Sequence, residues 1–147
     1  ANRGQEGDEL QTVLSGQLDG MAKHTADAQN FATAQKIALA DKYRARIAEF
    51  DTDGAVTEER LATEIAVLAA KADVTEELER LSAHISRGQS LVERDDAVGR
   101  DLGFLAEELN REANTLCSKS ASLDLTNAGL ALKSLIDQFK EQAANVE

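Results

Sequence analysis

The sequence predicts an all-α fold of about four helices, arranged as an elongated antiparallel bundle with a long first helix. Three observations support this prediction. The 147 residues contain no proline, so long helices need not be interrupted. Alanine and leucine are abundant and β-branched residues are sparse, a composition that favours helices. No alternation of apolar and polar residues typical of a strand persists along the chain.

The first expected helix is long and only thinly apolar. Residues 1–9 are polar and contain glycine, and we expect a linker or a frayed start there. Apolar residues then recur over 10–21 and again over 31–50, which predicts one helix, or two helices that meet near 16–20. One narrow apolar stripe buries too little surface to stabilise so long a helix by itself, so we expect the helix to pack on a partner.

A turn is expected at 51–54, where the sequence also imitates part of a calcium-binding loop. If Gly54 takes the sixth position of such a loop, the twelfth position falls on Arg60, where a calcium loop has a bidentate glutamate. A cation there defeats chelation, so we interpret the segment as a turn. Thr57 then caps the next helix, and two glutamates favour its first turn.

Three further helices are expected after this turn. The apolar spacing predicts them over about 58–87, 98–117 and 126–146. A kink or a recap of the helix is expected at 73–75, and the connections are expected at 88–96 and 118–124. The inward residues are, in helix order, Leu61, Ile65, Leu68, Ala72, Leu78, Leu81 and Ile85; Leu102, Leu105, Leu109 and Leu116; and Leu130, Leu132, Leu135, Ile136, Phe139, Ala143 and Val146.

Composition limits the classes of function. The formal net charge is −11, which argues against nonspecific binding of a phosphate backbone except at a local basic cluster. A single cysteine, Cys117, rules out an intrachain disulfide and suits a reducing compartment. No signal-peptide pattern and no apolar run near the length of a membrane span are present. A cytoplasmic protein without a membrane segment is therefore expected.

One group of candidate functional residues lies on the second predicted helix. Glu77, Arg80, His84 and Arg87 are spaced by three, four and three residues, which places them on one helix face. A histidine held by a carboxylate can act as a general acid or base near neutral pH, and arginines can grip phosphate. The alternative is a solvated helix face with glutamate–arginine pairs.

A second group lies on the third predicted helix. Glu108 and Glu112 are one turn apart with Arg111 beside them, and Asn110 and Asn114 lie nearby. The two carboxylates can bind a divalent cation, or position a water or a 2′-hydroxyl. The alternative is a ladder of intrahelical salt bridges. The asparagines favour a functional role, because asparagine is a poor residue for a helix interior.

Four other residues are weighed individually. Lys119 closes the third helix, where a cation is electrostatically favourable, whereas Arg100 near its start is mildly disfavoured and is expected to have a specific partner. His24 has no evident partner and receives no role. Cys117 lies on a largely apolar helix end, so we expect it to pack rather than to react.

Two stretches carry a resemblance to a known family. The stretch NREANTLCSKS (110–120), preceded by GRDLGFLAEE, and the stretch ADVTEELERLSAHI (72–85) are similar to the signatures of the YicC/YloC family of bacterial endoribonucleases. The opening EGDEL (6–10) is similar to the start of that family's C-terminal half. The resemblance covers nearly the whole chain, most specifically 58–120. It implies that the chain is the C-terminal half of a longer protein, with the N-terminal half absent.

The resemblance implies an endoribonuclease that acts on RNA, assembles as a homo-oligomer, most simply a hexamer, and uses a divalent metal such as Mg or Mn. We interpret residues 1–50 as a long helical arm and 51–147 as the helical core with the signature motifs. The expected catalytic residues are His84, Glu77, Glu108 and Glu112, with Glu108 and Glu112 also as metal ligands. The expected RNA- or phosphate-binding residues are Arg80, Arg100, Arg111, Asn110, Asn114 and Lys119.

A noncatalytic alternative is a helical module for oligomerisation and interaction, with the charged rows as salt bridges. The two hypotheses differ in where they place the charged side chains. An active site gathers Arg80, His84, Arg111 and Glu112 in an open cleft with unpaired arginines, whereas an interface buries them in satisfied pairs. Because of its acidity, the chain alone is expected to be weakly active or inactive.

Overall fold

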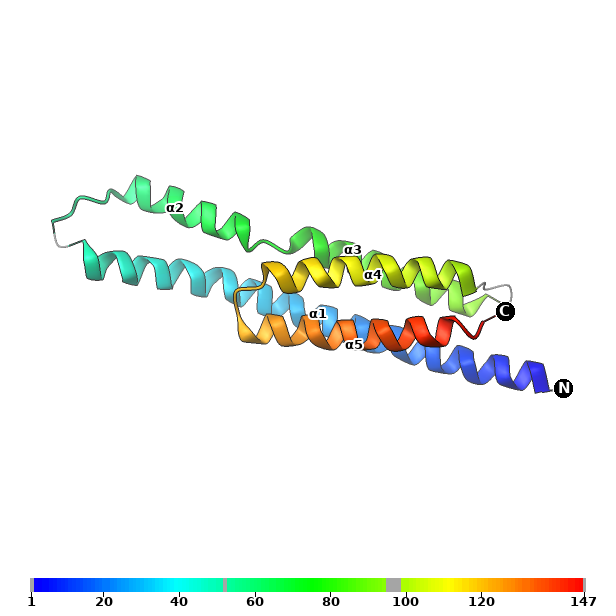
Figure 1. The fold of residues 1–147 in the computed structure, drawn as a ribbon. Coiled ribbons are helices and arrows are strands. Elements are labelled where there is room, and N and C mark those ends of the chain that lie inside the picture. Colours follow the sequence, from blue (N-terminus) through cyan, green and yellow to red (C-terminus); the bar gives the residue numbers. More distant parts are fainter. Residues whose placement is uncertain (1, 52, 95–98, 147) are drawn as a thin grey trace.

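A computed structural model describes residues 2–51, 53–94 and 99–146, and within these ranges the fold is all-α, as predicted (Figure 1). The helices are α1 (Asn2–Phe50), α2 (Glu58–Lys71), α3 (Thr75–Glu93), α4 (Gly99–Lys119) and α5 (Leu123–Ala143). No strand occurs in the described ranges. Nor does any helix there have an apolar stretch long enough to cross a membrane.

Four helices build the bundle. The first part of α1 packs on α3 and α5, and α4 also packs on α3 and α5, so the four form a closed ring around one core. The two chain ends lie at the same end of the bundle (Figure 1). The core residues are Leu14, Leu18, Met21, Ala28, Val74, Leu78, Leu81, Ile85, Val92, Leu102, Leu105, Ala106, Leu109, Ala113, Leu116, Leu125, Ala128, Leu132, Ile136, Phe139 and Ala143.

Helix α1 is continuous over 49 residues and has no break near 16–20. The linker expected at 1–9 is wrong for the described residues, because α1 begins at Asn2. These polar residues extend a helix that the apolar stripe from Leu14 onward already anchors in the core. Extending an existing helix requires no new nucleus, so a stretch with weak patterning can still be helical.

The last third of α1 and all of α2 form a hairpin that we call the distal arm, residues 36–71. It protrudes beyond the turn between α4 and α5 (Figure 1). Its tip is a turn, as predicted: the Asp51 carboxylate accepts hydrogen bonds from the backbone N–H groups of Ala55 (2.8 Å) and Val56 (3.1 Å). Gly54 has a φ of 67°, where glycine is favoured. The Thr57 hydroxyl caps α2, also as predicted.

The expected helix over 58–87 is two helices, α2 and α3, separated at 72–74 where a kink was expected. The connection expected at 88–96 begins too early, because α3 continues to Glu93. Gly88 is a buried position inside α3, and a Cβ there would lie 2.8 Å from Leu105 and 2.9 Å from Leu18. Glycine at this position therefore serves close helix packing rather than a turn. The expected helix start at Val98 lies outside the described residues.

Helix α5 differs from its prediction in one inward residue. Leu130 is 52% exposed, whereas Leu132, Ile136 and Phe139 are buried. These three define the apolar stripe by steps of four and three residues, and Leu130 lies on nearly the opposite side of the helix. The helix runs over Leu123–Ala143, so it begins and ends about three residues earlier than predicted. The Ser122 hydroxyl accepts a hydrogen bond from the backbone N–H of Leu125 (3.2 Å).

Candidate functional site

Most of the predicted site residues border the contact between α3 and the antiparallel helix α4. We call this line of charged side chains the α3–α4 seam. It consists of Glu77, Arg80 and His84 on α3 and Glu108, Glu112 and Lys119 on α4. Two ion pairs cross the seam, from Lys119 to Glu77 and from Arg80 to Glu112. The seam therefore joins both groups of residues that the sequence singled out.

The pair between Lys119 and Glu77 lies at the end of the seam next to the distal arm. The Lys119 ammonium is 3.1 and 3.3 Å from the two Glu77 carboxylate oxygens and 3.4 Å from the carbonyl oxygen of Asp73. Only 2% of the Glu77 side chain is exposed. A carboxylate so deeply buried requires a charged partner. This pair therefore ties the end of α4 to the start of α3.

The pair between Arg80 and Glu112 lies in the middle of the seam. Arg80 Nε is 2.9 Å from Glu112 Oε1, and Arg80 Nη2 is 3.4 Å from Glu76 Oε2. The hydrogen bond and charge of Glu112 raise the pKa of Arg80 above its ordinary value. The Arg80 side chain remains 51% exposed, and its Nη1 has no partner among the described residues. A phosphate oxygen can therefore still reach the guanidinium.

His84 lies one turn along α3 from Arg80, on the same face. Two contacts fix the register of the antiparallel helices: Arg80 meets Glu112, and Gly88 lies against Leu105. His84 falls between these contacts, so the matching position on α4 in this register is that of Glu108, although no ion pair joins the two side chains. The imidazole is half-buried and makes no hydrogen bond or ion pair with any described residue. This side chain is thus free to act on a ligand.

Arg111 flanks the seam on its solvent side. Its Nη1 is 3.6 Å from Glu108 Oε1, and 71% of its side chain is exposed. The contact is a weak surface pair between residues three apart on one helix. Because this pair is weak, the Arg111 guanidinium can leave Glu108 and bind an anionic ligand near His84 with little loss of stability.

The structure does not bring the remaining predicted residues to the seam. At 100° per residue, Asn110 and Asn114 each lie about 160° around α4 from Glu112. Asn110 is half-buried on the side of α4 that carries Cys117, which faces α5, and Asn114 is exposed. Arg100 is exposed on the outer face of α4, about three turns from Arg111. Their predicted role in RNA binding stays a prediction.

Comparison with known proteins identifies the family. Residues 28–147 match the family described as endoribonuclease YicC-like, C-terminal. The chain belongs to this family. It is 33% identical over 146 residues to a protein of Clostridioides difficile and 37% identical over 149 residues to one of Haemophilus influenzae, each named "Probable endoribonuclease YicC". The matches cover 99% and 100% of this chain and 50% of each relative, so the chain spans about half the length of these curated relatives.

The carboxylates of this YicC-like chain do not form an evident metal site. Among the described residues, no three His, Cys, Asp or Glu side chains lie together in a way that would hold a metal ion. The Glu112 carboxylate is engaged with Arg80, and Glu108 faces Arg111. A divalent cation between Glu108 and Glu112 would have to compete with both guanidinium groups. The prediction that Glu108 and Glu112 bind a metal therefore stays a prediction.

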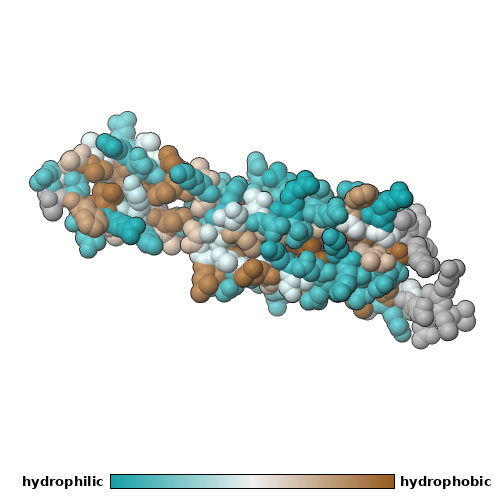
Figure 2. All heavy atoms as spheres, viewed as in Figure 1, coloured by the Kyte–Doolittle hydropathy of each residue, from teal (hydrophilic) through white to brown (hydrophobic). Residues whose placement is uncertain are grey.

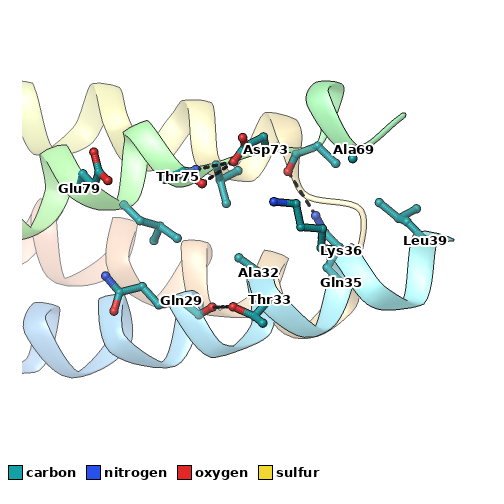
Figure 3. Close-up of a pocket in the computed structure, with 13 residues that line it drawn as sticks. Gln29, Ala32, Thr33, Gln35, Lys36, Leu39, Ala69, Asp73, Thr75 and Glu79 are labelled. Atoms are coloured by element: carbon teal, nitrogen blue, oxygen red, sulfur yellow. Dashed lines mark hydrogen bonds between the residues drawn. The ribbon is translucent and has the colours of Figure 1, made fainter. Parts of the chain in front are cut away.

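A separate pocket of about 250 Å³ lies between α1 and the break that separates α2 from α3 (Figure 3). Lys36 and Gln35 of α1 line one side, and Asp73 and Thr75 line the other. The Asp73 carboxylate accepts hydrogen bonds from the N–H (3.0 Å) and hydroxyl (2.5 Å) of Thr75, which lower its pKa. A kink or a recap at 73–75 was expected from the sequence, whereas the pocket beside it was not, because its other side comes from Gln35 and Lys36, which are distant in sequence.

Cys117 is half-buried and behaves as the sequence predicts. Burial raises the pKa of its thiol above the ordinary value, with a smaller opposing effect from Lys133. Less thiolate at neutral pH means a poorer nucleophile. Cys117 also packs closely against α5, since a Cβ at Gly129 would collide with its sulfur. The second histidine, His24, is half-buried on α1, remote in sequence from the seam.

Proposed function

We propose that the protein containing this YicC-like chain is an endoribonuclease and that the α3–α4 seam contributes to its cleavage site. The names of its relatives support the reaction class. The observation that carries the assignment to the seam is His84, a half-buried imidazole with no partner among the described residues, next to Arg80 and across from Glu108. A functional group held among charged residues and not used by the fold is a reasonable catalyst.

In the proposed reaction, His84 removes the proton from a ribose 2′-hydroxyl. The 2′-oxygen forms a bond to the adjacent phosphorus, the bond from phosphorus to the 5′-oxygen breaks, and water protonates the departing 5′-oxygen. The products are a 2′,3′-cyclic phosphate and a 5′-hydroxyl. Arg80 and Arg111 stabilise the negative charge that develops on the phosphate. Glu108 stabilises the imidazolium that forms, as a carboxylate partner does in other histidine-dependent sites.

Glu112 and the pair between Glu77 and Lys119 have positioning roles in this proposal. Glu112 holds the guanidinium of Arg80 through Nε, which leaves Nη1 for the phosphate. Glu77 and Lys119 fix the two helices against each other. None of these steps requires a metal ion, and chelation tests the expected Mg or Mn dependence.

The test is cleavage of a labelled RNA by the full-length protein, with and without EDTA. His84→Ala is expected to lower the rate at saturating protein by about 10²–10⁴-fold, the usual contribution of a general base. His24→Ala is the matched control and should cleave at the wild-type rate. Normal cleavage by His84→Ala, with the fold retained, would remove the seam from the mechanism. A rate abolished by EDTA would show that the reaction needs a metal ion.

The noncatalytic alternative is favoured by one specific observation. Two of the seam's cations are already paired with buried carboxylates, as a structural interface would have them. The two hypotheses differ at His84: an interface needs no free imidazole, whereas catalysis does. The cleavage experiment therefore decides between them.

We propose further that the full protein works in the cytoplasm as a homo-oligomer, with the hexamer that the family resemblance implies. RNA is its proposed substrate. The chain alone should cleave RNA weakly or not at all, because a net charge of −11 opposes RNA binding. Light scattering on the full-length protein, alongside the cleavage assay on both forms, checks these expectations.

A further inference from the structure

The distal arm contains the most basic stretch of an acidic chain. Between residues 36 and 46, the sequence places four of the chain's 16 lysine and arginine residues, with Asp41 as the single carboxylate. These cations are Lys36, Lys42, Arg44 and Arg46, and all four are exposed. Because the chain as a whole carries 27 acidic residues, such a local concentration stands out as a site for an anionic ligand.

Three exposed side chains of this stretch form one stripe along α1. Lys42, Arg46 and Phe50 are spaced by four residues, so they lie one above another on the helix. Phe50 is 78% exposed. Neither Lys42 nor Arg46 forms an ion pair with any described residue, although Glu49 is only three residues from Arg46. We call these three residues the arm stripe.

Arg44, by contrast, is a cation of this arm that forms an ion pair within the fold. It lies on another side of α1, and its Nη1 is 3.5 Å from Glu58 Oε2 on α2. This pair links the two helices of the arm. Lys42 and Arg46 make no such link, so the packing of the arm does not account for them.

The arm stripe continues the side of α1 that faces the turn between α4 and α5. Gln35 marks this side, because its Oε1 accepts a hydrogen bond from the backbone N–H of Ala121 (2.8 Å). Lys42 lies seven residues, or two turns, further along α1. The stripe therefore lies just beyond the end of α4 and α5, where neither of these two helices covers α1 and only α2 packs beside it (Figure 1).

The stripe and the α3–α4 seam lie on either side of this junction. The Asp73 carbonyl oxygen accepts a hydrogen bond from Lys119 at the end of α4, which places Asp73 at the junction. Arg80 lies seven residues further along the chain, in α3. With a rise of 1.5 Å per residue, Arg80 and Lys42 each lie about 10 Å from the junction, roughly 20 Å apart along the molecule. One extended strand of a few nucleotides can span that separation.

We propose that the arm stripe binds a single strand of RNA and delivers it to the seam. Lys42 and Arg46 contact phosphates, and a base stacks on Phe50, the combination of cations and aromatic rings that single-stranded nucleic acids require. The acidic remainder of the chain disfavours other paths for the strand. The identity of the ligand as RNA rests on the proposed function, and the location of the site rests on the stripe.

The test measures binding separately from cleavage. Fluorescence anisotropy with a labelled single-stranded RNA of about 20 nucleotides gives the affinity of the full-length protein as a function of salt. The variant Lys42→Gln/Arg46→Gln should bind roughly tenfold more weakly at low salt. The slope of log affinity against log salt should fall by about 1.4, since each phosphate contact on a single strand contributes about 0.7. Phe50→Leu should weaken binding without changing the slope.

The matched control is Lys23→Gln/Lys140→Gln, which removes the same charge from exposed positions on the bundle and should leave the slope unchanged. Equal affinity and slope for wild type and the arm-stripe variant would overturn the proposal. A changed oligomeric mass with an unchanged slope would also overturn it and assign the stripe to a protein interface. If the wild type binds RNA through the stripe but cleaves none, the proposed function fails while the assignment of the stripe as an RNA-binding site stands.

Discussion

The bundle and the distal arm share helix α1, yet they are packed very differently. In the bundle, α1 buries Leu14, Leu18 and Met21 in a core with α3 and α5. Along 36–50, which the structure describes in full, no residue of α1 is buried, and α2 buries only Leu61. Figure 2 shows hydrophobic residues among hydrophilic ones on the arm surface. A pair of helices cannot enclose a core, so its apolar side chains remain partly in water.

This difference shows which side chains the fold does not use for packing or for ion pairs. In the bundle, most charged side chains of the seam form the ion pairs that hold α3 to α4. On the arm, cations and apolar residues are exposed and have few structural tasks. We therefore expect the bundle to dominate the stability of the chain and the arm to dominate its contacts with other molecules. Three comparisons of variants sharpen or break this contrast.

The largest difference is expected between matched leucine substitutions. Leu109 in α4 is fully buried, and Leu109→Ala should lower the free energy of unfolding by about 2–5 kcal/mol, because it leaves a cavity in the core. Leu68→Ala in α2 should cost about 1 kcal/mol, because Leu68 is only half-buried. Urea denaturation followed by circular dichroism measures both. Equal losses would show that the arm is covered in solution.

A smaller difference is expected between the ion pairs of the two regions. Lys119→Met leaves the buried carboxylate of Glu77 without its charged partner and should cost about 2 kcal/mol. Arg44→Met removes the exposed pair with Glu58 on the arm and should cost no more than about 0.5 kcal/mol. Denaturation midpoints for the two variants give the comparison. A negligible loss for Lys119→Met would mean that the Glu77 pair does not tie α4 to α3.

The smallest effect is expected at Asp73, between the two regions. Its pKa is lowered in the folded chain from an ordinary value of 3.8 by hydrogen bonds from Thr75. The resulting stabilisation is present above that ordinary value and is lost as pH falls through the folded value. Asp73→Asn can keep the hydrogen bond but cannot titrate. Its stability should fall less steeply than that of the wild type below about pH 5. Parallel curves would exclude a contribution from Asp73.

Much of the bundle could be predicted from the sequence because its apolar stripes are regular. All four leucines expected on the inner face of α4 are buried, as are Leu78, Leu81 and Ile85 of α3. Gly88 misled the prediction, since a glycine followed by polar residues resembles a connection. Its buried role depends on Leu18 and Leu105, which are distant in sequence.

The candidate site was only partly predictable. Spacing placed Arg80 with His84 and Glu108 with Glu112, but the pairs that cross from α3 to α4 depend on the register between the helices. Only the structure supplies that register. The arm stripe had a signal in the sequence, a cluster of cations, which the overall charge of −11 obscured.

The most direct test of this division of labour is a single-turnover cleavage assay on the full-length protein over a range of protein concentrations. It separates the maximal rate from the concentration that gives half of that rate. We predict that His84→Ala lowers the maximal rate and leaves the half-saturating concentration near the wild-type value. Lys42→Gln/Arg46→Gln should raise the half-saturating concentration and leave the maximal rate unchanged. The account would be contradicted if His84→Ala kept the wild-type maximal rate, or if the arm-stripe variant lowered that rate without weakening binding.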